Sequence, residues 1–159
     1  MPLRDETQSA LDALGLFAHD HRDLDTASGD AGLHAVISSS DRLAVGFDEF
    51  RVTRFSWAVQ PLGKLKTIAD VLARRLSYLL EPIGTIEVDG EQCVVQMRSI
   101  PPAKDAEGIN YYELLVQRGG VLSLVRYRKT PQTERTVIPA MVTREVFLRL
   151  VEDFGSAVG

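Results

Sequence analysis

Three histidines lie close together in the chain, and histidine is both a metal ligand and a frequent acid–base catalyst. His19, His21 and His34 fall within 16 residues, with aspartates between them. In an extended segment the His-x-His spacing places two imidazoles on the same side, and a carboxylate can complete a zinc-like site. The candidate metal ligands are His19, His21 and Asp23. A solvated acidic loop is the alternative interpretation, because such short patterns are of low specificity.

A second group of residues has the composition of an anion-binding surface. Arg118, Arg126 and Arg128 lie close together in the sequence, and Tyr127 stands between two of them. Basic side chains interleaved with aromatic rings can bind phosphate or single-stranded nucleic acid. These four residues are therefore the candidate binding residues. Strand alternation separates Tyr127 from its two neighbours, so the other interpretation is a charged sheet end that prevents edge-to-edge pairing.

Cys93 is the only cysteine and the only candidate thiol nucleophile. A reactive thiolate needs an adjacent base or a helix N-terminus, and no histidine lies within 50 residues of Cys93 in the sequence. We interpret it as a small buried hydrophobic residue. The glycine pairs and scattered carboxylates match no nucleophile-elbow, phosphate-loop or C-x-x-C pattern. The sequence therefore names no catalytic residue and no cofactor, and a non-enzymatic protein is favoured.

Composition and charge limit the classes of protein to which this chain can belong. The chain has 159 residues, of which 45% are hydrophobic and 25% charged, and a net charge of −4. Residues 1–32 carry two arginines against seven acids, so the acidity is concentrated there. Mild acidity argues against nucleic acid as the main partner. A single cysteine cannot form an internal disulfide, and neither an N-terminal apolar run nor a stretch of about 18 apolar residues is present. We expect a cytoplasmic protein without membrane contact.

The elements that must position these residues follow from periodicity and turn signals. Apolar residues at helical spacing predict helices over 5–17, 67–81 and 143–154, the last two capped by Thr67 and Thr143. The polar residues 19–32 are predicted to form a loop or mobile linker. Strand patterns, several of them separated by Asp-Gly or Gly-Gly turns, cover residues 34–38, 42–47, 50–60, 83–88, 91–99, 109–118, 121–129 and 134–138.

These connections are too short for parallel crossovers. The predicted fold class is therefore α+β: an antiparallel meander of about four to six strands packed against helix 67–81 and the C-terminal helix 143–154. The predicted organisation is an acidic N-terminal helix and polar linker over 1–32, followed by a single α+β domain over 33–159.

Two functional hypotheses follow. The first is a protein-binding or adaptor domain with a protein partner or a second copy, in which the acidic N-terminal arm could dock. The second is a small-ligand cup or small enzyme. The order of strand 50–60, helix, strands and helix resembles the helix-grip proteins, whose curled sheet encloses a cavity, and this resemblance implies a pocket on the concave face of the sheet. Side chains of Leu72, Leu76, Phe147 and Leu150 filling that face would leave no room for a ligand.

Overall fold

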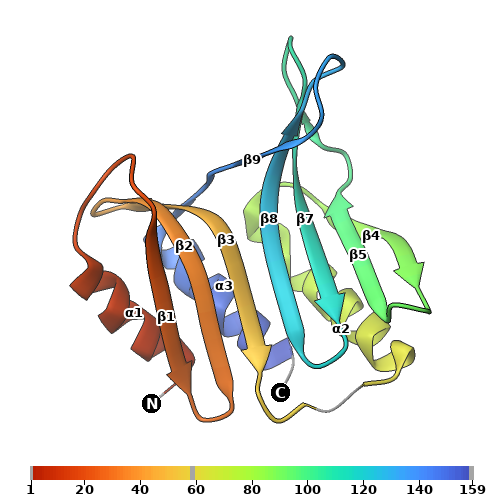
Figure 1. Ribbon diagram of the computed structural model, residues 1–159, viewed down its shortest axis with the longest axis horizontal. Coiled ribbons are helices and arrows are strands. Elements are labelled where there is room, and N and C mark those ends of the chain that lie inside the picture. Colours follow the sequence, from red (N-terminus) through yellow and green to blue (C-terminus); the bar gives the residue numbers. More distant parts are fainter. Residues whose placement is uncertain (1, 58–59, 158–159) are drawn as a thin grey trace.

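A computed structural model describes residues 2–57 and 60–157 as one antiparallel sheet with three helices (Figure 1). The helices are α1 (Leu3–Leu14), α2 (Leu62–Arg75), which continues into the short 3-10 helix η1 (Leu76–Leu79), and α3 (Arg144–Ala157). The strands are β1 (Arg22–Ser28), β2 (Ala31–Ser40), β3 (Ala44–Arg54), β4 (Ile83–Asp89), β5 (Val94–Ser99), β6 (Ala103–Lys104), β7 (Ile109–Gln117), β8 (Val121–Lys129), β9 (Thr136–Ile138) and β10 (Ala140–Thr143).

The main sheet has the strand order β1-β2-β3-β8-β7-β5-β4, and every described pairing is antiparallel. Helix α2 carries the chain from β3 to β4 at the far edge, and the next strands return inward until β8 pairs with β3. The short strands β6, β9 and β10 pair with β7, β8 and β3. The predicted α+β class is thus confirmed, with more strands than expected.

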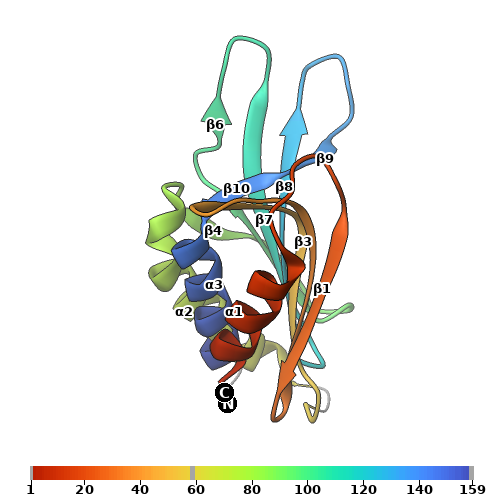
Figure 2. The same ribbon diagram turned by 90° about the vertical axis from the view of Figure 1, so that its left-hand side faces the viewer.

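All three helices cover the same face of the sheet, so the protein has two layers (Figure 2). The apolar residues along one side of each helix explain this arrangement. In α2 and η1 the buried residues are Leu65, Ile68, Ala69, Leu72, Leu76 and Leu79, at the spacing of one helix face. Helix α3 begins where predicted, because the Val146 N–H donates to the Thr143 hydroxyl at 3.1 Å.

Four phenylalanines fill the space between the layers. Phe47 and Phe50 of β3 contact Phe147 of α3 with ring centroids 5.8 and 5.6 Å apart, and Phe154 lies 5.2 Å from Phe50. All four rings are fully buried. Leu72, Leu76 and Leu150 are also buried in this core, so the side chains named for filling the concave face do fill it.

The linker prediction is wrong at residues 22–28, which form the edge strand β1 paired with β2. Strand β1 was missed because Leu24 is its only large apolar residue, and Leu24 is buried in the core. Helix α1 packs on β1 and α3 through Leu3 and Leu11. The N-terminal segment therefore docks on its own sheet and shares the main core instead of forming a separate arm.

Three local predictions also need correction. The proposed strand over 50–60 is the end of β3, which runs on from Ala44 and stops at Arg54, while Val59 lies outside the described residues. Helix α2 begins at Leu62, and the Thr67 hydroxyl donates to the Gly63 carbonyl inside the helix instead of capping it. Cys93 stands in the β4–β5 turn with φ 53°, half buried, not inside a strand. Among the described residues, no helix is both long and apolar enough to span a membrane.

Candidate functional site

The face of the sheet opposite the helices carries the most distinctive group of polar side chains. Because side chains alternate along a strand, each strand that buries one set of residues under the helices presents the other set on this helix-free face. On β1 and β2, Leu24 and Leu33 are buried, whereas their neighbours Asp25 and His34 point to the helix-free face. The register then places Arg51 of β3 beside His34.

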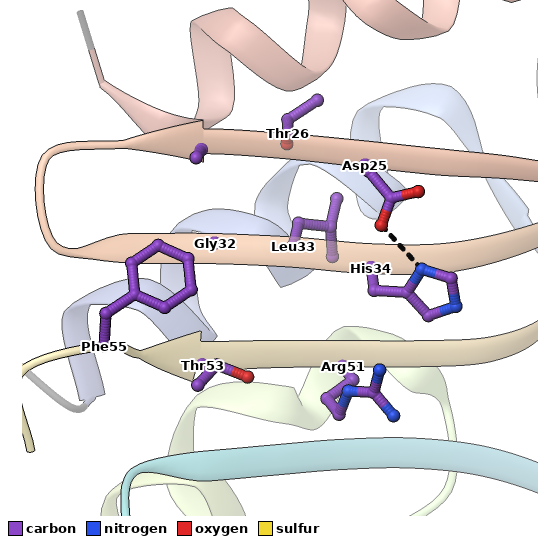
Figure 3. Close-up of a pocket in the computed structure, with 9 residues that line it drawn as sticks. Asp25, Thr26, Gly32, Leu33, His34, Arg51, Thr53 and Phe55 are labelled. Carbon is purple, nitrogen blue, oxygen red and sulfur yellow. Dashed lines mark hydrogen bonds and ion pairs between the residues drawn. The ribbon is translucent and has the colours of Figure 1, made fainter.

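A depression of about 400 Å³ lies on this face over β1, β2 and β3 (Figure 3). The Phe55 ring, which is 60% exposed, forms one wall. Gly32 lies directly beneath the ring, and a Cβ at this position would overlap the ring. Glycine at position 32 therefore lets the aromatic ring lie flat against the strand.

The Phe55 wall is held in place by the turn between β1 and β2. The Phe55 N–H donates to the Asp30 carbonyl at 2.7 Å, and the Ser56 N–H donates to the Asp30 carboxylate at 2.7 Å. The Ser56 hydroxyl donates to the second oxygen of the same carboxylate. Three hydrogen bonds from one residue pair thus fix the backbone that carries the ring, so the wall is preformed.

His34 forms the polar side of the depression. Its Nδ1 lies 2.7 Å from Asp25, and its Nε2 lies 4.0 Å from the Glu49 carboxylate. Arg51 pairs with the other Glu49 oxygen at 3.1 Å. The imidazole stands between two carboxylates, and Asp25 itself is exposed. This arrangement offers negative charge to a ligand, whereas nucleophilic catalysis would need a hydroxyl or thiol bonded to the imidazole.

The whole β1–β3 part of the helix-free face is acidic. Four carboxylates stand against the single guanidinium of Arg51, which leaves a charge of −3 with both imidazoles neutral. The four acids are Asp23, Asp25, Asp48 and Glu49. A surface of this sign next to an exposed aromatic ring suits a cationic ligand.

The other half of the helix-free face holds a nearly buried glutamate, Glu113 of β7, which is only 6% exposed. Its carboxylate accepts hydrogen bonds from Gln96 and from Arg135, the latter at 2.8 Å, and Arg98 lies 4.0 Å away. Arg98 and Arg135 stack on Tyr111 and Tyr127. These guanidinium groups are engaged by Glu113 and the rings, so this cluster is suited to stabilising the sheet.

The structure does not bring the four predicted binding residues together. Arg126 lies on the helix side, 2.8 Å from Glu81 and over Tyr112. Arg128 pairs with Asp105 at 2.9 Å, and this contact lowers the pKa of the Asp105 carboxyl. Tyr127 lies on the opposite face, against Tyr111, and Arg118 is exposed beyond the end of β7.

The three predicted metal ligands are also dispersed. His21 lies 2.8 Å from Asp48, Asp23 stands exposed on β1, and His19 precedes the strand with φ 56°. Within residues 2–57 and 60–157, no three His, Cys, Asp or Glu side chains gather closely enough to hold a metal ion.

Sequence reasoning missed Asp25, Arg51 and Phe55 as site residues. The useful signal was the Gly29-Asp30 pair, a dipeptide typical of two-residue hairpin turns. It predicts that residues 22–28 pair with the next strand and so places Asp25 beside His34. Comparisons with protein-family models, curated proteins and solved structures found no match for this chain.

Proposed function

We propose that this protein is a non-enzymatic protein-binding domain whose depression beside Phe55 receives a lysine or arginine side chain from an extended segment of a partner. One observation carries the proposal. A fixed, exposed aromatic ring lines one end of the depression and the exposed carboxylate of Asp25 lines the other end, on a sheet face that the described helices leave uncovered.

The energetics of such a contact are modest. A cation over an exposed aromatic ring contributes about 0.5–1 kcal/mol, and more when it is desolvated. The Asp25 carboxylate adds attraction to the same cation, and the −3 charge of the surrounding β1–β3 face attracts basic segments. One side chain therefore gives weak binding, and a partner needs several basic residues along an extended segment for useful affinity.

The filled core supports protein binding over a small-ligand cup. Phe147, Leu150, Leu72 and Leu76 occupy the space between sheet and helices that a cup would need. The depression on the helix-free face is open and shaped by side chains on its rim, which suits a partner side chain better than an enclosed small molecule.

The same proposal places the protein in the cytoplasm and does not include nucleic acid as a partner. The single Cys93 gives no disulfide framework, as is typical of reducing compartments. Phosphate groups would be repelled by the acidic β1–β3 face, and the predicted basic residues Arg126 and Arg128 are engaged by acids of this chain.

A titration of ¹⁵N-labelled protein followed by NMR tests the proposal. The probe is the peptide acetyl-Ala-Ala-Lys-Ala-Ala-amide, and the comparison peptide carries glutamate in place of lysine. We expect amide shifts at Gly32, His34, Thr53 and Phe55 with the lysine peptide only. Asp25→Asn and Phe55→Ala should each weaken this binding at least threefold.

Asp70→Asn is the matched control, because it makes the same chemical change at an exposed position of α2 on the other layer. Its binding should equal that of the unmodified protein. Equal shifts with both peptides would refute the proposal, as would an Asp25→Asn variant that binds like the unmodified protein. The spectra themselves report whether each variant is folded.

A further inference from the structure

The imidazole of His34 is surrounded by charged groups from both neighbouring strands. Its side chain is 26% exposed, and its Nδ1 lies 2.7 Å from Asp25 of β1 (Figure 3). On β3, the Glu49 carboxylate lies 4.0 Å from Nε2, and Arg51 pairs with Glu49 at 3.1 Å. Asp23 stands two residues along β1 on the same face. The ring therefore lies among three carboxylates and one guanidinium group.

The hydrogen bond to Asp25 determines which ring nitrogen of His34 gains a proton. An ionised carboxylate can only accept hydrogen bonds, so Nδ1 carries the hydrogen of the neutral ring. The unprotonated Nε2 then presents its lone pair toward Glu49. A second proton binds at Nε2, and the imidazolium that forms is a full positive charge between two carboxylates.

We propose that protonation of His34 weakens the binding of cations in the depression beside Phe55, so that the protein holds a basic segment at neutral pH and releases it at mildly acidic pH. This inference rests on the proposed function, because it concerns the regulation of the same site. Histidine is the side chain whose charge ordinarily changes between pH 5 and 8, whereas aspartate, glutamate and arginine keep their charge in this range.

Two effects of the proton on His34 oppose a cationic ligand. The imidazolium forms an ion pair with Asp25, which is the carboxylate that attracts the ammonium group of the ligand, and it changes the charge of the β1–β3 part of the face from −3 to −2. The imidazolium also repels the ammonium group directly. Repulsion between two unit charges about 4–5 Å apart in water corresponds to a roughly four- to fivefold change in affinity.

A second histidine on the same face, His21, provides a comparison. It also pairs with a carboxylate, since its Nδ1 lies 2.8 Å from Asp48. His21 stands four residues before Asp25, which is about 13 Å in an extended chain. This distance exceeds the Debye length of about 8 Å at physiological ionic strength. Protonation of His21 should therefore have little effect on a cation beside Asp25.

The test measures the binding of acetyl-Ala-Ala-Lys-Ala-Ala-amide by NMR at about pH 7.5 and about pH 5.5 in physiological salt. Both ends of this peptide are blocked and its lysine stays charged, so a change in affinity reports on the protein. We expect the dissociation constant to rise at least threefold at the lower pH. His34→Gln should bind equally at both pH values, because its amide can donate to Asp25 but cannot gain a charge. His21→Gln is the matched control and should weaken as the unmodified protein does.

The possible results distinguish this inference from the proposed function. Absence of peptide binding at both pH values would refute the proposed function and, with it, the role of His34. Peptide binding that is equal or stronger at the lower pH would overturn the role of His34 alone. A His34→Gln variant that still binds more weakly at the lower pH would overturn it as well. The spectra of the free proteins show whether each variant is folded at both pH values.

Discussion

Replacing Gly32 with alanine tests whether the wall of the depression depends on a missing side chain. The backbone of Gly32 does not need glycine for its own conformation, since its φ is not in the left-handed region. Glycine is required because the Phe55 ring occupies the space of a Cβ. The substitution should therefore displace the ring without straining the strand.

The size of the effect follows from the burial of Phe55. The residue is 60% exposed, so about 40% of a surface of roughly 200 Å², or about 80 Å², is covered. At about 25 cal/mol per Å², burial of this area contributes about 2 kcal/mol to the free energy of unfolding. Alanine in place of glycine recovers about 0.5–1 kcal/mol through the unfolded state. Gly32→Ala should thus lower the free energy of unfolding by about 1–1.5 kcal/mol.

A double-mutant cycle isolates this contact. In a Phe55→Ala background the ring is gone, so Gly32→Ala should stabilise the protein by about 0.5–1 kcal/mol. Urea unfolding of the four proteins, followed by circular dichroism, should give a coupling energy of about 2 kcal/mol between positions 32 and 55. The reasoning is refuted if Gly32→Ala has the same cost in both backgrounds.

Two further predictions concern the N-terminal segment and the behaviour in acid. Leu11→Ala should destabilise the protein by about 2–5 kcal/mol in thermal or urea unfolding, because Leu11 is buried against the sheet. Leu16→Ala, at an exposed position, should change the free energy of unfolding by less than about 0.5 kcal/mol. Equal effects of the two substitutions would show that α1 is not part of the core. Backbone N–H groups of Ala44 and Leu43 lower the pKa of Asp41 below its ordinary value of 3.8, and Arg128 with the N–H groups of Glu107 and Gly108 lowers that of Asp105. A carboxyl whose pKa is lower in the folded state stabilises the fold fully above its unfolded pKa and loses this contribution as pH falls through the folded pKa. The urea concentration at the unfolding midpoint should therefore decrease as the pH is lowered below about 4. This decrease should be less steep for an Asp41→Asn, Asp105→Asn double variant. The same dependence of the midpoint on pH in both proteins would contradict this account.

Local patterns were sufficient wherever neighbouring residues carry the structural information. The leucine spacing of α2 predicted its buried side, and Thr143 marked the start of α3. The Gly-Gly turn predicted the β7–β8 hairpin, where both glycines adopt positive φ. Apolar periodicity failed at β1, because a strand with one buried leucine resembles a polar loop, and only the Gly29-Asp30 turn signal indicates its pairing with β2.

The candidate site needed more than local pattern. Strand alternation predicts that Arg126 and Tyr127 lie on opposite faces of the sheet. It does not predict that Glu81 lies beside Arg126 on one face, or that Glu113 pairs with Arg135 on the other. Asp25, His34 and Arg51 meet only because three strands pair in one register.

The amino-acid order alone determined the α+β class, the apolar faces of the two later helices and the tight hairpin turns, because each of these depends on residues a few positions apart. Only the folded chain decided that α2 delivers β4 to the far edge, that β8 pairs with β3, and that Phe55 lies on Gly32. The reason is physical: strand partners and the placement of side chains across strands depend on how the whole hydrophobic core is closed, and no local window contains that information.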